Sequence, residues 1–196
     1  MKKVMGVIGA AMLVLAFHAP AQGLDLRAGG NVNFGTANDF GVGPRVELDI
    51  GEALPGLRLA VDYHKFFDSS VYSDINGLAV ESKSWDVGFH ILYDVATVPL
   101  AEGATIYVGA GLLYVKRSYD HWLKSSEAYI SDGDLKKLEA DYQSNSGMSG
   151  ALLVGSTFNT GWTVIPYVEA RYTIGVIDEL MLSAGILFST GGGAPR

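Results

Sequence analysis

The feature that most constrains the fold is the alternation of apolar and polar residues along most of the chain. In residues 164–175, VIPYVEARYTIG, every second residue is apolar, and Tyr167, Glu169 and Arg171 lie between the apolar positions. A period of two places successive side chains on opposite faces of a β-strand. Such a strand has one apolar face and one charged face, and the direction in which each face points decides the class of protein.

Segments with this period recur along the chain, separated by turn-forming residues. They cover residues 24–34, 41–50, 57–67, 85–95, 105–117, 147–158, 163–175 and 181–188. The polar side is not purely polar, because Leu113, Val115, Leu153 and Leu187 fall on it. All the segments still share one predominantly apolar face. The pattern predicts an all-β protein, an eight-stranded antiparallel up-and-down β-barrel over residues 22–188.

The first residues have the three parts of a secretory signal. Lys2 and Lys3 precede an apolar run from Val4 to Phe17, and Ala19 and Ala21 form a small-residue cleavage pattern. A membrane anchor is the alternative, but this run is shorter than the roughly 20 residues that a spanning helix needs. We expect residues 1–21 to be a cleaved signal peptide, the mature protein to be exported, and residues 189–196 to be a short C-terminal tail.

Charge and cysteine content exclude several classes of protein. Without Lys2 and Lys3, 12 basic residues face 21 acidic ones, and the formal charge falls from -7 to -9. Such a charge disfavours phosphate-rich partners, so no nucleic acid binding is expected. The chain has no cysteine, which excludes disulfides and cysteine-based metal or nucleophile sites.

Two arrangements satisfy the alternation. In a soluble lipocalin-like barrel the apolar face points inward and binds a ligand, whereas in a transmembrane barrel it faces lipid and the polar face lines the lumen. Glycine and short polar residues dominate the polar face, which suits a crowded interior better than a solvated surface. Aromatic residues cluster near segment ends on the apolar face, and Lys65 and Lys116 also lie near ends, where a lysine can snorkel to headgroups. These features favour the transmembrane barrel.

Two segments carry a family resemblance. IYVGAGLLYV (106–115) and VIPYVEARYTIG (164–175) resemble signatures of the OmpA-like and opacity-type outer membrane β-barrel proteins. The resemblance covers residues 24–188 and implies a Gram-negative outer membrane location and a protein of the porin-like, cell-surface type. The chain differs from full-length OmpA-like proteins because only STGGGAPR follows the last segment.

The polar face predicts an ion-paired, plugged lumen. An eight-stranded barrel is just wide enough for its side chains to fill, and charges of both signs in that space should pair. The predicted lumen charge network consists of Arg27, Arg45, Glu47, Asp49, Arg58, Asp62, His64, Asp86, His90, Arg117, Glu169 and Arg171, with Asp25 beside it. A narrow path for ions, water or small solutes through these residues is the functional alternative.

The sequence contains two groups of residues that could be catalytic, but no specific catalytic or metal-binding motif. Two groups are candidates for a lipid-modifying enzyme: His64 with Asp68, Ser69 and Ser70, and His121 with Asp120, Ser125 and Ser126. Neither has the spacing of a specific motif, so the sequence predicts no catalytic residue, cofactor site or metal site.

The connections between segments suggest where partners would bind. The two long ones, 68–84 and 118–146, both fall on the outer side if the N-terminus is periplasmic. Loops on a rigid scaffold commonly carry recognition. We therefore expect a monomer that contacts outer membrane lipid, lipopolysaccharide and the insertion machinery, with an extracellular ligand possible at these loops.

Overall fold

The computed structural model describes residues 25–36, 40–50, 54–67, 69–72, 78–98, 103–123, 145–160 and 162–189. These residues form strands β1 (Asp25–Gly35), β2 (Phe40–Asp49), β3 (Leu57–Phe66), β4 (Ser69–Tyr72), β5 (Leu78–Val98), β6 (Ala104–Leu123), β7 (Asn145–Phe158), β8 (Val164–Ile174) and β9 (Glu179–Ser189). None of the described residues belongs to a helix long and apolar enough to cross a membrane.

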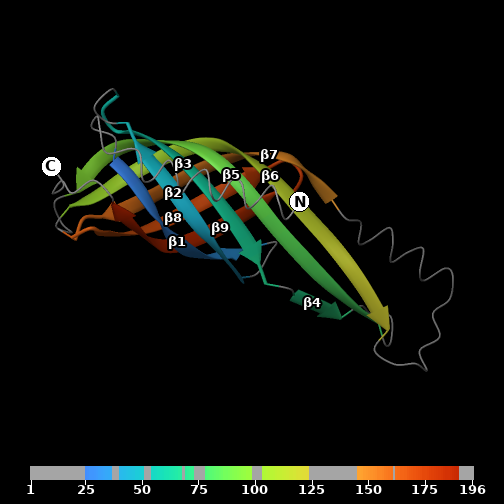
Figure 1. Cartoon of the computed structure of the whole chain (residues 1–196). Helices are drawn as coiled ribbons and strands as arrows, with labels where there is room; N and C mark the ends of the chain where they lie inside the picture. The colour runs from blue at the N-terminus through green and yellow to red at the C-terminus, as the bar shows by residue number, and fades with distance from the viewer. Residues whose placement is uncertain are drawn as a thin grey trace.

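Eight of the strands close into an antiparallel barrel, as the alternation predicts (Figure 1). The order around the wall is β3-β2-β1-β9-β8-β7-β6-β5, and β5 pairs back with β3 from Leu57↔Tyr93 to Lys65↔Trp85. This last pairing leaves no open edge around the barrel, which is the condition for exposing a sheet to hydrocarbon.

The two faces of the wall are separated residue by residue. On β5, Phe89 and Ile91 are 49% and 48% exposed, whereas their neighbours His90 and Leu92 are fully buried. The same alternation runs along β7, β8 and β9. Apolar side chains therefore cover the outside of the barrel, and the inside is filled mainly by polar ones.

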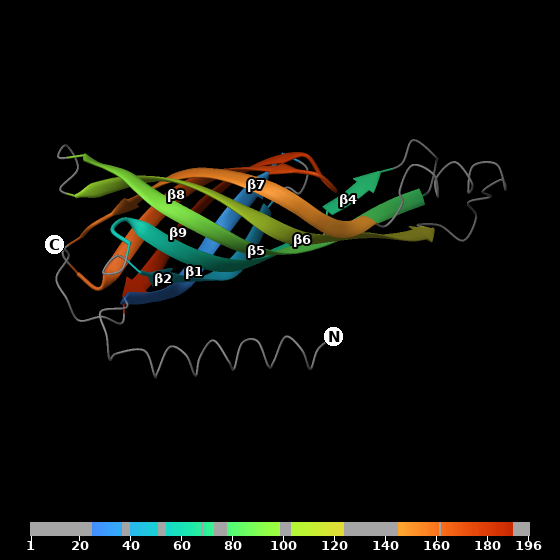
Figure 2. The ribbon, with the colours of Figure 1, turned by 90° about the horizontal axis from the view of Figure 1, so that it is seen from above.

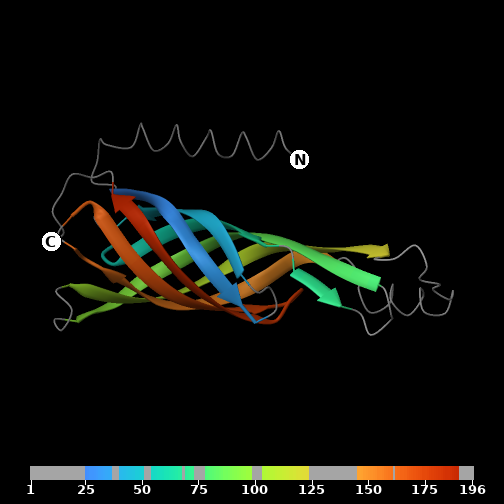
Figure 3. The ribbon, with the colours of Figure 1, turned by 90° about the horizontal axis from the view of Figure 1, so that it is seen from below.

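Two strands are longer than the sequence predicts. The predicted connections 68–84 and 118–146 are partly strand, because β5 starts at Leu78, β6 runs to Leu123 and the short β4 pairs with β5. These strands continue past the end of the barrel, where β4 lies (Figures 2 and 3). The prediction was wrong there because VESKS and SYDH lack the apolar alternation on which it relied, while β5–β6 pairing continues through backbone hydrogen bonds.

Two glycines with a positive φ lie next to strands at the opposite end of the barrel. Gly56 lies in the turn before β3 with φ +81° and Gly103 precedes β6 with φ +105°, a region that glycine adopts without strain. A register shift between Asp94 and Ala96 interrupts the β5–β6 ladder near this end, and pairing continues beyond it to Val98↔Ala104.

Several sequence predictions lie outside the described residues. These are the signal peptide (1–21), the C-terminal tail beyond Ser189, and most of the connection 118–146.

Candidate functional site

The barrel interior gathers most of the predicted lumen charges. Arg45, Glu47, Arg58, Asp62, His64, Asp86, His90, Glu169 and Arg171 are all buried. Arg27 and Asp49 are half-buried at the end where β1 begins, and Arg117 lies near the opposite end of the barrel. The inward positions of strands far apart in the sequence thus place these side chains in one lumen.

Two arginines and two glutamates form one cluster. Arg45 Nε donates to Glu47 Oε1 at 2.8 Å and its Nη1 donates to Glu169 Oε2 at 2.9 Å, while Arg58 Nη1 donates to Glu47 Oε2 at 2.7 Å. Glu47 is therefore shared by both guanidinium groups. Charge-assisted bonds of this kind offset part of the cost of removing the ions from water.

Two tyrosines cover this cluster. The Arg45 guanidinium lies 4.8 Å from the centre of the Tyr167 ring, and that of Arg58 lies 4.7 Å from the centre of the Tyr107 ring. Tyr107 also donates from its hydroxyl to Glu169 Oε2 at 2.9 Å. The rings exclude water from the ion pairs and stabilise the cations through their π faces.

A smaller cluster lies at the end where β1 begins. Arg27 donates to Asp25 at 2.8 Å and to Asp49 at 2.7 Å, and Arg58 donates from Nη2 to Asp94 Oδ1 at 2.6 Å. The half-buried acids here link the interior to the barrel end.

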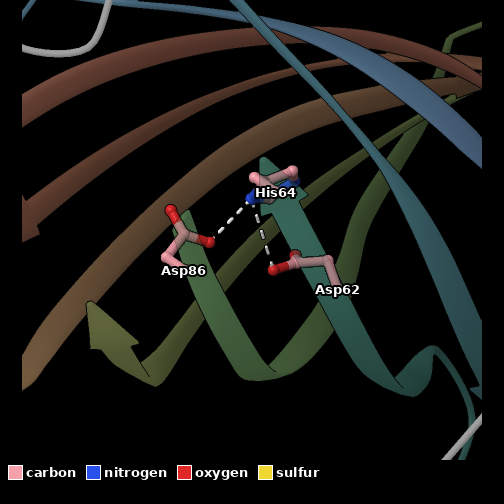
Figure 4. A group of neighbouring side chains, drawn as sticks. All are labelled: Asp62, His64 and Asp86. Atoms are coloured by element: carbon pink, nitrogen blue, oxygen red, sulfur yellow. Dashed lines mark hydrogen bonds and ion pairs between the residues drawn. The ribbon is translucent and has the colours of Figure 1, made fainter. Parts of the chain in front are cut away.

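The second large cluster contains the histidines. Figure 4 shows Asp62 and His64 of β3 pointing towards Asp86 of β5. His64 Nδ1 lies 2.8 Å from Asp86 Oδ1 and 3.7 Å from Asp62 Oδ1, and His90 Nε2 lies 3.0 Å from Asp62 Oδ2. Because Asn31 Nδ2 faces His64 Nε2 at 3.3 Å, the tautomer with hydrogen on Nδ1 satisfies the contacts of His64 with Asn31 and Asp86.

Glycines make the room that this cluster needs. A Cβ on Gly88 would lie 2.3 Å from His90 Nε2, and one on Gly111 would lie 2.3 Å from His90 Nδ1. The imidazole of His90 therefore occupies space that any larger residue at these two positions would take.

This cluster is also where the described residues could hold a metal ion, because one ligand atom each of Asp62, His64 and Asp86 lie within 4.8 Å of one another. Arg171 already supplies a cation there, with Nη2 2.7 Å from Asp86 Oδ2 and Nη1 3.5 Å from Asp62 Oδ1. A metal ion would have to displace this guanidinium from the carboxylates. The arrangement is an ion-pair network rather than an open coordination site.

Neutral polar groups connect the clusters. Asn31 donates to the Tyr167 hydroxyl at 2.8 Å, Asn33 donates to Asn31 Oδ1 at 2.9 Å, and Ser183 donates to Asn33 Oδ1 at 2.6 Å. Sequence reasoning missed Asn31, Tyr107 and Tyr167 because it counted only charged residues. Their positions in the alternation already placed them on the polar face.

An apolar cluster fills the interior near the β8–β9 turn. Leu113, Val115, Ala151 and Leu153 are buried together, and Ile177 of that turn packs against them. The turn is held by Val176 N donating to Ser149 Oγ at 3.0 Å. Of the residues that interrupt the polar face in the sequence, Leu113, Val115 and Leu153 thus form an apolar layer inside the barrel, whereas Leu187 is buried near the other end, where β9 pairs with Gly29.

The residues considered for catalysis do not form a described site. Among them, His64 is buried in the ion-pair network. The side chains of Asp68, Ser69, Ser70, Asp120, His121, Ser125 and Ser126 lie outside the described part of the chain.

Known structures share this fold. The N-terminal β-barrel domain of OprF from Pseudomonas aeruginosa matches with a TM-score of 0.55 at 12% identity, covering 84% of this chain and 96% of that one. A major outer membrane protein from Thermus thermophilus matches with a TM-score of 0.55 at 12% identity, covering 86% of this chain and 100% of that one. Neisserial surface protein A matches with a TM-score of 0.52 at 20% identity, covering 85% and 97%.

At the level of sequence, no family model and no curated protein matches the chain. The evidence for its class is the closed barrel, its two faces and the structural likeness. The chain therefore has the fold of the small eight-stranded outer membrane β-barrels, as the OmpA-like and opacity-type resemblance of its strands implies.

Proposed function

We propose that this protein is a monomeric outer membrane β-barrel with a structural and surface-interaction role and a sealed lumen. The observation that carries the proposal is the inversion of its two faces: large apolar side chains are exposed around the wall, and ion pairs are buried within it. A wall of this kind is stable in lipid, whereas in water it would expose an apolar surface all around the barrel.

The height of the apolar wall fits a membrane. From Trp85 to Val95 the outward positions of β5 are apolar, and ten residues at about 3.3 Å each, tilted by about 40°, rise ~25 Å. This is the height of the apolar band of outer membrane barrels, which is about 25 Å. The structural likeness to the major outer membrane protein from Thermus thermophilus also supports a location in the outer membrane.

Two layers support the sealed lumen. Arg45, Arg58 and Arg171 are each held by carboxylates on two strands, and these carboxylates come from β2, β3, β5 and β8. The apolar cluster of Leu113, Val115, Ala151 and Leu153 lies between this polar layer and one end of the barrel. A hydrated ion would have to part both layers. We therefore expect very small conductance in planar bilayers, and large stable channels would contradict the sealed lumen.

No enzymatic activity is part of the proposal. Incubation of the purified protein with lipopolysaccharide, followed by mass spectrometry of lipid A, should return the lipid unchanged. A modified lipid A would instead favour an enzyme with its active site at the outer rim of the barrel.

The part of the chain best placed for an extracellular partner is the extension formed by β4 and the ends of β5 and β6, beyond the barrel.

Membrane fractionation with a heat-modifiability gel tests the proposal. The protein should sediment with outer membranes and migrate differently before and after boiling, because a closed barrel resists the detergent until heated. A mature chain that stays monomeric and dissolved without detergent would favour the lipocalin-like alternative.

A further inference from the structure

The charged side chains that the structure describes on the outer wall lie in one sector of the barrel. Among the outward-facing side chains that the structure describes in the eight barrel strands, the charged ones are Lys65, Lys83 and Lys116. They lie on β3, β5 and β6, which are neighbours in the wall. Lysines that only snorkel to headgroups could lie on any strand around the rim, whereas these share one sector.

The strand register brings them to almost the same height. Lys65 pairs with Trp85, and Trp85 pairs with Lys116, so a single row runs lysine, tryptophan, lysine across three strands. With strands about 4.8 Å apart, the two lysine Cα atoms are separated by roughly 10 Å. Lys83 lies two residues before Trp85 on the same face of β5. The three ammonium groups can therefore converge on one anionic headgroup.

An aromatic cluster of Tyr63, Trp85 and Tyr114 lies at this row. The Trp85 ring centroid is 6.2 Å from that of Tyr63 and 5.7 Å from that of Tyr114. Below them the outward positions of β5 are apolar, beginning with Val87 and Phe89. Tryptophan and tyrosine prefer the boundary between hydrocarbon and headgroups, so the row of lysines lies at that boundary.

The row is at the end of the barrel opposite the start of β1 and the end of β9. Lys65↔Trp85 is the last pair between β3 and β5 before β4 and the ends of β5 and β6 continue past the barrel. If the chain is the outer membrane barrel proposed above, with its N-terminus periplasmic, this end meets the outer leaflet. The inference rests on that proposal.

We infer that Lys65, Lys83 and Lys116, with Trp85 between them, bind the phosphate groups of an outer-leaflet glycolipid of the lipid A type. The lysines provide positive charge for the phosphates. The apolar wall beneath accepts the acyl chains, which extend in the same direction as the strands. A free phosphate ion would contact only the lysines, whereas a lipid would also contact the aromatic cluster and the apolar wall. These additional contacts favour a lipid over the ion.

The test uses the mature chain folded into neutral detergent micelles, with the temperature at which the folded gel band is lost as the readout. Diphosphorylated lipid A should raise this temperature in a saturable way. Dephosphorylated lipid A and inorganic phosphate are the comparison ligands, and both should act far more weakly. In the K65Q/K83Q/K116Q variant, the concentration of diphosphorylated lipid A needed for half the effect should rise roughly 10- to 100-fold.

A matched variant separates the site from net charge. K124Q/K136Q/K137Q removes the same number of lysines outside the described residues and should keep the response of the unmodified chain. Equal loss of response in both variants, equal action of dephosphorylated lipid A, or equal action of inorganic phosphate would overturn the site. Failure of the unmodified chain to give a heat-modifiable band would instead contradict the proposed barrel itself, and the two failures are thus distinguishable.

Discussion

The inner and outer faces of the barrel wall are stabilised in different ways: the inner face by ion pairs and hydrogen bonds, and the outer face by contact with an apolar medium. On β5, Asp86 and His90 point inward, where Asp86 pairs with Arg171 and His90 Nε2 lies 3.0 Å from Asp62, while Val87, Phe89 and Ile91 point outward and are 38%, 49% and 48% exposed. Each inner charge is stabilised by a specific partner, whereas each outer side chain needs only an apolar medium. Removing one polar group from an inner residue should therefore destabilise the barrel. An outer residue should tolerate such a loss, but the barrel should be destabilised when an outer residue is replaced by a charged one.

The largest effect is expected from breaking an inner ion pair. Arg45→Met leaves Glu169 and Glu47 without one of their partners in the barrel interior, and should lower the free energy of unfolding by about 3–5 kcal/mol. Urea unfolding of the protein folded into lipid vesicles, followed by tryptophan fluorescence, measures it. Arg27→Met is the control, because its acidic partners at the barrel end are partly open to solvent, and it should cost about 1 kcal/mol or less. Equal losses would mean that solvent reaches both sites alike.

A charge on the outer face should come next. Ile91→Lys places an ammonium near the middle of the apolar band and should cost about 2–4 kcal/mol in lipid vesicles, whereas Val95→Lys near the band edge should cost about 0–1 kcal/mol. The same urea titration applies. A neutral or stabilising effect of Ile91→Lys would show that this face is not in contact with lipid.

Removing one inner hydroxyl should have a smaller effect. Tyr107→Phe deletes the donor to Glu169 Oε2 but keeps the ring over Arg58, with an expected loss of about 1.5–3 kcal/mol. Tyr93→Phe on the outer face, where the ring is half-exposed, is the matched change. If both substitutions have the same effect, the Tyr107 hydrogen bond does not stabilise the barrel.

The smallest difference separates two adjacent leucines of β7. Leu153 is 4% exposed inside the barrel and Leu152 is 57% exposed outside it. Leu153→Ala leaves a cavity, while lipid chains fill the space left by Leu152→Ala, so the inner change should cost about 1–2 kcal/mol more. Unfolding of both variants in the same vesicles gives this difference directly, and equal costs would mean that the apolar layer inside the barrel collapses to fill the gap.

Much of the fold could be predicted because its signal is local. The alternation located every barrel strand and separated the two faces, and it placed Arg45, Glu169 and Arg171 together on the inner one. It underestimated β5 and β6, since their outer ends lie beyond the apolar band and have no alternation to detect. The alternation also could not explain Leu113 and Leu153, which are apolar residues on the polar face. The structure shows that they belong to one buried apolar cluster inside the barrel.

The sequence by itself determined the class of this protein: strands of about ten residues with one apolar and one charged face, and enough opposite charges to pair. Only the tertiary structure decided which charges meet. Arg45 and Glu169 are 124 residues apart, and the lysines of β3 and β6 share a row only through β5. The physical reason is that the facing of a side chain depends on its immediate neighbours, whereas pairing across the lumen depends on the closure and register of the whole barrel.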